Sequence, residues 1–77
     1  MGAFARNGLA VAVTGVLSAR EIECLRWISE GKSTIDAGAI LGLSPRTVKF
    51  HMDNARRKLD CHTTVQAVAT AVRRGLL

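Results

Sequence analysis

Basic, acidic and aromatic side chains recur along residues 45–59 at spacings that could gather them for DNA recognition. At 100° per residue, one face of a helix would carry Arg46, Lys49, Phe50, Asp53 and Arg57. Arg and Lys donate hydrogen bonds to guanine acceptors in the major groove, and an aromatic ring can contact a thymine methyl group. The Asp53 carboxylate could accept a hydrogen bond from cytosine N4 or orient a neighbouring base. The spacing therefore predicts a face that reads base edges.

Further polar groups near this face are expected to contact the sugar-phosphate backbone. Asn54 lies beside the face, and the basic run Arg56–Lys58 could neutralise phosphates. Helix N-termini also bind phosphate, which points to the hydroxyl groups that begin the two helices around the turn described below. The complete predicted DNA-binding set is Lys32, Ser33, Ser44, Arg46, Thr47, Lys49, Phe50, Asp53, Asn54, Arg56, Arg57 and Lys58.

Charged residues at helical spacing often form only a solvated surface, so the DNA interpretation needs further support. The opposite stripe of the same helix is apolar and runs through Val48, Met52, Ala55 and Leu59, with His51 at its margin. That stripe leaves Phe50 among charged residues on the outside. We interpret His51 as a packed or phosphate-bonded histidine rather than a metal ligand or a base.

Charge is distributed unevenly along the 77 residues. Residues 1–38 carry four basic and four acidic side chains, whereas residues 39–77 carry seven basic and two acidic ones, which accounts for the formal charge of +5. A basic half beside a neutral half favours an anionic partner, and double-stranded DNA is the first candidate. A role in solubility alone is the alternative.

Helix-start and helix-stop signals divide residues 17–77 into four helices. The predicted helices span residues 18–30, 34–41, 45–59 and 63–74. Ser18 with Glu21, and Thr63 with Gln66, have the spacing of capping boxes. Few aromatic residues and many Leu, Ile, Val and Ala residues suit packed helices better than a small sheet. The expected fold is an all-α four-helix bundle with a helix-turn-helix.

The helix-turn-helix is predicted from a very short connection. Only Gly42-Leu43-Ser44 separates two helices, and Ser44 with Pro45 is a favourable helix start. So tight a connection makes the helices cross steeply. Gly38 inside the first of them costs up to about 1 kcal/mol relative to alanine, which predicts that a second helix comes very close. Glu21 falls within an apolar arc, so we expect it to have a structural role with a cation or amide partner.

Apolar residues on the last helix form two groups. Val65, Val68, Ala69 and Val72 make one stripe, and Ala67 with Ala71 makes a patch of small residues. One group can face the core while the other meets a second copy across a two-fold axis. The predicted dimer interface comprises Val65, Val68, Ala69, Ala71 and Val72, and would match half-sites about one turn of DNA apart. Alternatively, the alanines only favour helix formation.

Other classes of function receive little support. The sequence shows no nucleophile-base pair, metal-ligand cluster or phosphate-binding loop, so we expect neither an enzyme nor a bound metal or cofactor. The two cysteines are too few for a disulfide-stabilised secreted domain, which favours a reducing cytoplasm. The apolar run Leu9–Val13 is too short to cross a membrane. Residues 1–16 are interpreted as a flexible tail or linker, and residues 17–77 as the domain.

The order of these motifs resembles that of LuxR-type helix-turn-helix domains. The segments that carry the resemblance are Leu17–Glu21, Glu23–Trp27, Glu30–Ser33, Leu41–Ser44, Thr47–His51, Asn54–Leu59, Gln66–Val68 and Gly75–Leu77. The pattern TVKFH…NA.RKL…QAV…GLL is most similar to the branch that responds to acyl-homoserine lactones in quorum sensing. The resemblance implies an output domain of a transcriptional regulator, with residues 45–59 in the major groove and the last helix mediating dimerisation on DNA.

Three departures from the family pattern stand out. Asp53 is acidic where several relatives carry a basic or neutral polar residue, so base preference cannot be transferred. Ala37-Gly38 replaces the more usual Ile-Ala, and His62-Thr63-Thr64 differs from the common cap.

Two other functions stay open: a promoter-binding domain like that of a sigma factor, which would associate with RNA polymerase, and a module that sequesters another regulator.

Overall fold

The computed structural model describes residues 17–77, which form four α-helices. They are α2 (Ala19–Ser29), α3 (Thr34–Leu41), α4 (Pro45–Lys58) and α5 (Thr64–Arg73). The predicted all-α, four-helix architecture is confirmed. The predicted range 34–41 matches α3, and the other three predicted ranges are longer by one or two residues because they include capping residues such as Ser18, Leu59 and Thr63. The tail predicted over residues 1–16 lies outside the described residues.

Local hydrogen bonds explain where each helix begins. The Ser18 hydroxyl accepts from the Glu21 amide at 3.1 Å, and the Ser18 amide donates to the Glu21 carboxylate at 2.8 Å, which completes a capping box. Thr63 and Gln66 form the second predicted capping box. Ser33 is the N-cap of α3, because its hydroxyl accepts from the Asp36 amide at 3.1 Å.

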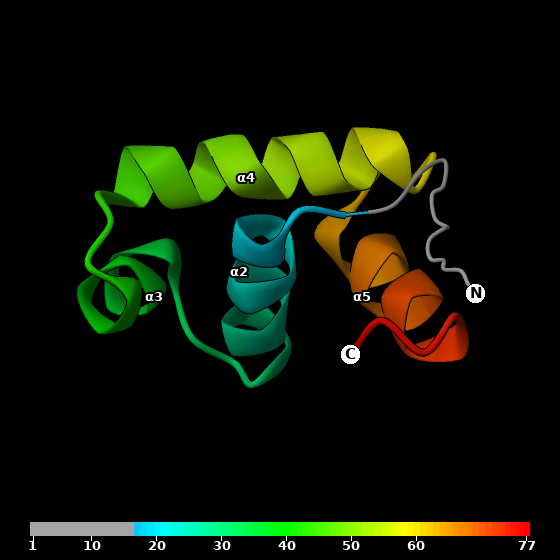
Figure 1. Ribbon diagram of the computed structural model, residues 1–77, viewed down its shortest axis with the longest axis horizontal. Coiled ribbons are helices and arrows are strands. Elements are labelled where there is room, and N and C mark those ends of the chain that lie inside the picture. The colour runs from blue at the N-terminus through cyan, green and yellow to red at the C-terminus, as the bar shows by residue number, and fades with distance from the viewer. Residues whose placement is uncertain (1–16) are drawn as a thin grey trace.

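The long helix α4 lies across the other three helices, which are arranged side by side beneath it (Figure 1). Its inner face carries Val48, Met52 and Ala55, all of them buried, and Leu59 is buried at the C-cap. These residues pack against Leu25 of α2, whose side chain is fully buried. Burying one such aliphatic side chain contributes roughly 1.5–3 kcal/mol. The core therefore fixes which face of α4 points outward.

The turn between α3 and α4 has the predicted tight geometry. Gly42 ends α3 with φ of 72°, a left-handed conformation that glycine adopts without steric cost. The Leu43 amide then donates to the Gly38 carbonyl at 2.8 Å. A Cβ atom on Gly38 would collide with the carbonyl oxygen of Leu43. The close neighbour of Gly38 is therefore the backbone of the turn, up to Ser44 at the N-cap of α4, so the predicted close approach is made where the chain enters the second helix.

One face of α5 packs on the core and the other faces outward. Ala67, Thr70 and Ala71 are buried, whereas Val65 and Val72 are 79% and 58% exposed. The assignment of Ala71 to a dimer interface is therefore corrected, since its side chain has no surface left for a second copy to contact. Within residues 17–77, no helix has both the length and the apolar character needed to cross a membrane.

Candidate nucleic-acid interface

The outer face of α4 presents the side chains that the helical spacing predicts. Arg46, Lys49, Phe50 and Arg57 are exposed, while Val48 on the opposite side is fully buried. Phe50 is 60% exposed although burial of an aromatic ring is normally favourable. The Phe50 and His51 rings meet edge to face with centroids 5.6 Å apart. This contact gives an outward-facing aromatic ring a defined orientation among cations.

Two hydroxyl groups mark the start of α4. The Ser44 hydroxyl accepts from the Thr47 amide at 3.1 Å and donates to the Thr47 hydroxyl at 2.9 Å. Pro45 occupies the first turn, where a missing amide hydrogen is not needed. The first turn of a helix also carries partial positive charge from its unpaired amides. Ser44 and Thr47 are thus placed where an anionic group would be stabilised, as Ser33 is at the start of α3.

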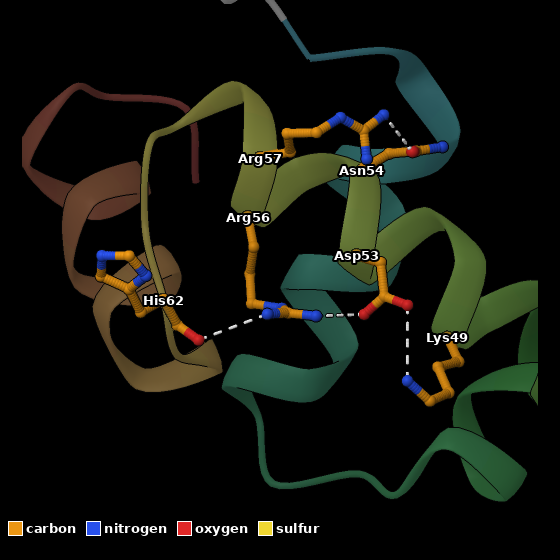
Figure 2. A network of polar contacts seen from close by, with 6 residues as sticks. All are labelled: Lys49, Asp53, Asn54, Arg56, Arg57 and His62. Atoms are coloured by element: carbon orange, nitrogen blue, oxygen red, sulfur yellow. Dashed lines mark hydrogen bonds and ion pairs between the residues drawn. The ribbon is translucent and has the colours of Figure 1, made fainter.

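A chain of polar contacts runs along the side of α4 to the start of α5 (Figure 2). The Lys49 ammonium lies 3.4 Å from the Asp53 carboxylate, and the other oxygen of that carboxylate pairs with the Arg56 guanidinium. The second Arg56 nitrogen donates to the His62 carbonyl at 3.3 Å. Three of the predicted DNA-binding residues are therefore linked through the Asp53 carboxylate.

These contacts hold Asp53 in its charged form. The Arg56 hydrogen bond is the largest cause that lowers the pKa of Asp53 below its ordinary value, and Lys49 lowers it further. The sequence prediction relates Asp53 to bases alone and does not identify Lys49 and Arg56 as its partners. Their spacing of three and four residues is the signal that could have revealed them, because such residues are neighbours on a helix.

Arg57 has a partner on its own helix. Its guanidinium donates to the Asn54 side-chain oxygen at 2.6 Å, one turn earlier (Figure 2). Both side chains lie on the outer part of α4, and Arg57 is exposed. The hydrogen bond limits the rotamers of a long side chain while the guanidinium stays accessible to an anion.

Lys58 reaches from the end of α4 to a residue of α2. Its ammonium lies 2.9 Å from the carboxylate of Glu21, a residue that is only 4% exposed. Burial raises the pKa of Glu21, but the Ser18 amide and Lys58 together outweigh that effect and lower it below the ordinary value. The expectation that buried Glu21 has a cation or amide partner is confirmed, since its carboxylate contacts both Lys58 and the Ser18 amide. The sequence prediction had assigned Lys58 only to phosphate and did not connect the two residues.

Two exposed apolar residues on α3 were not singled out from the sequence. Ile35 and Ile40 are 67% and 48% exposed. Lys32, which precedes α3, is exposed as well. In an eight-residue helix with little polar surface, the alternation that would separate buried from exposed apolar positions is too short to read.

The order of helices and this exposed basic face can be compared with known proteins. Residues 15–71, well over half of the chain, match the family model described as bacterial regulatory proteins, luxR family. The chain belongs to the luxR family. It contains a LuxR-type helix-turn-helix DNA-binding domain, and the resemblance predicted from its motifs is confirmed.

Curated relatives of the LuxR-type domain are longer regulators. The transcriptional activator protein LuxR of Aliivibrio fischeri strain ATCC 700601 / ES114 is 47% identical over 62 residues, which cover 80% of this chain and 25% of the relative. The transcriptional activator protein SolR of Ralstonia nicotianae is 42% identical over 77 residues, covering 100% of this chain and 33% of SolR. The chain thus spans a quarter to a third of these relatives.

Solved structures share the arrangement of the LuxR-type domain. The transcription factor GerE superposes with a TM-score of 0.77 at 33% identity, covering 79% of this chain and 91% of GerE. SdiA of Escherichia coli gives a TM-score of 0.75 at 32% identity, covering 92% of this chain and 30% of SdiA. The all-α helix-turn-helix fold is therefore common to this chain and to experimentally determined structures.

Proposed function

We propose that this domain binds duplex DNA sequence-specifically with α4 in the major groove. The observation that supports the proposal best is the outer face of α4, where Phe50 remains 60% exposed beside Arg46 and Lys49. Cations at such positions can donate to guanine, and the ring can contact a thymine methyl group. The buried stripe through Val48 sets the rotation of the helix, so these groups point outward together.

The DNA backbone would be held by groups on both sides of this face. Lys32 and Ser33 lie at the start of α3, Ser44 and Thr47 lie at the start of α4, and Arg57 is exposed near the end of α4. Contacts at separate points along the backbone fix the register of the recognition helix without reading sequence. Lys58 also belongs to this set. Its side chain is paired with Glu21 but remains 37% exposed, so its ammonium is accessible to a phosphate.

The exposed side of α5 is proposed as the contact between two copies on DNA. Val65 and Val72 are well exposed, Ala69 is exposed and Val68 is partly buried. An apolar stripe on one helix is self-complementary across a two-fold axis. Two copies would then place two α4 helices in successive major grooves about one helical turn apart.

The relatives give the proposal its biological setting. LuxR and SolR are named transcriptional activators, and VjbR of Brucella ovis, 38% identical over 68 residues, is named a quorum sensing-dependent regulator. We therefore propose that the chain is the DNA-binding output of a cytoplasmic transcriptional regulator that acts with RNA polymerase and responds to a quorum-sensing signal.

Fluorescence anisotropy with labelled duplexes tests DNA binding directly. A random-sequence pool serves first, and a duplex selected from that pool by the domain serves second. Each phosphate contact should contribute about 0.9 to the negative slope of log K against log salt concentration for B-DNA. A flat salt dependence, or no binding to either duplex, would favour a module that sequesters another regulator. Stable association with core RNA polymerase in the absence of DNA would favour the sigma-factor alternative.

A further inference from the structure

Asp53 occupies an unusual place on the proposed DNA-binding face. Its carboxylate stands between Lys49, whose ammonium is 3.4 Å away, and Arg56, which pairs with the other carboxylate oxygen (Figure 2). An acidic group within a surface that approaches phosphates is electrostatically unfavourable. Lys49 and Arg56 compensate for that charge in the free protein.

The two cations differ in how firmly they are held. Arg56 is anchored at a second point, because it also donates to the His62 carbonyl at 3.3 Å, and its side chain is 29% exposed. The Lys49 side chain is 70% exposed, and its contact with Asp53 is an ordinary surface ion pair of four-residue spacing. Such pairs are weak enough to exchange partners. Arg56 thus keeps the Asp53 carboxylate in place, while Lys49 can leave it.

The release of Lys49 from Asp53 has different consequences when Lys49 binds a phosphate and when it binds a base. A phosphate that approaches Lys49 must displace the Asp53 carboxylate and is repelled by it at the same time. A guanine edge is neutral and offers directional acceptors, so it suffers no comparable repulsion. The carboxylate therefore weakens the sequence-independent part of binding more than the base-reading part.

We propose that Asp53 is a specificity-determining residue that restrains Lys49 from binding phosphates indiscriminately. The inference rests on the proposed function, namely that α4 enters the groove of duplex DNA. It assigns Asp53 a role through its own neighbours in the protein, in contrast to the direct contact with cytosine that the sequence suggested.

The test compares Asp53→Asn with Asp60→Asn, which removes the same charge elsewhere. Asp60 is exposed, has φ of 57°, a conformation that asparagine tolerates, and forms no ion pair within residues 17–77. Binding is measured by anisotropy on the random pool and on the duplex selected with the wild-type domain. Circular dichroism during heating verifies that both variants remain folded.

For Asp53→Asn, we expect affinity for the random pool to rise at least about threefold more than for Asp60→Asn. The salt slope should steepen by about one, as expected when one more cation binds phosphate. The ratio of selected to random affinity should fall. When both substitutions are made in a Lys49→Gln variant, Asp53→Asn should raise the affinity for the random pool no more than Asp60→Asn does.

Several results would overturn this inference. Equal effects of the two Asp→Asn variants would show that only net charge matters. Weaker binding to the selected duplex with no gain on the random pool would show that Asp53 reads a base itself. A full effect that persists with Lys49→Gln would exclude Lys49 as the route. Failure of the wild-type domain to bind either duplex would instead refute the proposed function and this inference with it.

Discussion

The carboxylate of Glu21 and the ammonium of Lys58 lie 2.9 Å apart although 37 residues separate them along the chain. Glu21 belongs to the first turn of α2 and Lys58 to the last turn of α4. Glu21 also accepts from the Ser18 amide, so the same carboxylate caps α2 and holds the C-terminal end of α4. Helix capping and the position of α4 are thereby linked through one buried group.

Substitution of Lys58 by methionine should destabilise the domain. Glu21 would remain buried with only local donors, and an unpaired buried charge is costly. Because the Lys58 side chain is 37% exposed, water can replace part of its contribution, and we expect a loss of about 1–2 kcal/mol. Urea denaturation measures the free energy of unfolding. Lys32→Met is the control on an exposed cation, and equal losses in the two variants would contradict the prediction.

Acid should weaken the domain through Glu21. Its pKa is lowered in the folded state from an ordinary value of 4.5, so the folded protein binds its proton less readily than the unfolded chain does. The contribution of Glu21 is therefore fully present above the unfolded pKa and is lost as pH falls through the lower, folded value. Urea denaturation across this acidic range should show a smaller pH dependence for Glu21→Gln. An unchanged profile in that variant would exclude Glu21 as the group responsible.

Gly38→Ala should destabilise the domain although alanine is the better helix former. The added Cβ would meet the Leu43 carbonyl oxygen within the turn, and the turn backbone can move only by disturbing the start of α4. Helix propensity alone predicts a gain of about 1 kcal/mol. Ala39→Gly, at an exposed position of the same helix, measures that propensity term in this context. A higher thermal midpoint for Gly38→Ala would show that the turn accommodates the methyl group.

These cases show which features can be predicted from the sequence. Helix starts are local, since Ser18 needs only Glu21 three residues away, and they were predicted correctly. The rotation of α4 follows from the periodic stripe through Val48. In contrast, the partner of Glu21 lies 37 residues away, and nothing local to either residue identifies it. The helix α5 carries small apolar residues on two faces, so the buried position of Ala71 could not be separated from an exposed one by periodicity alone.

The exposed face of α5 can be tested with a pair of substitutions. Val65→Asp changes a side chain that is 79% exposed, so the fold should survive while the proposed contact between two copies is lost. Ala71→Asp places a charge at a fully buried position and should unfold the domain. Sedimentation with a duplex that carries two half-sites should show two bound copies of the wild-type domain but only one bound copy of Val65→Asp. Undiminished pairing of Val65→Asp on that duplex would place the dimer contact elsewhere.

Neighbouring substitutions on opposite faces of α4 separate folding from DNA binding. Val48 is fully buried, so Val48→Asp should lower the free energy of unfolding by more than about 3 kcal/mol, which is a large part of the stability of a small domain. Phe50 is 60% exposed, so Phe50→Asp should keep the helical circular dichroism spectrum. Its added charge should nevertheless weaken DNA binding in the anisotropy assay.

Val48→Asp and Phe50→Asp introduce the same side chain at positions only two residues apart, so a difference between them reflects the face of α4 and not the kind of substitution. A folded Val48→Asp would contradict the observed rotation of α4. Undiminished DNA affinity of a folded Phe50→Asp would remove the outer face of α4 from the interface, whatever the remaining basic residues do. We expect Phe50→Asp to fold but not to bind DNA, and Val48→Asp to be unfolded. That pair of results would tie the proposed function to the side of α4 that the core leaves exposed.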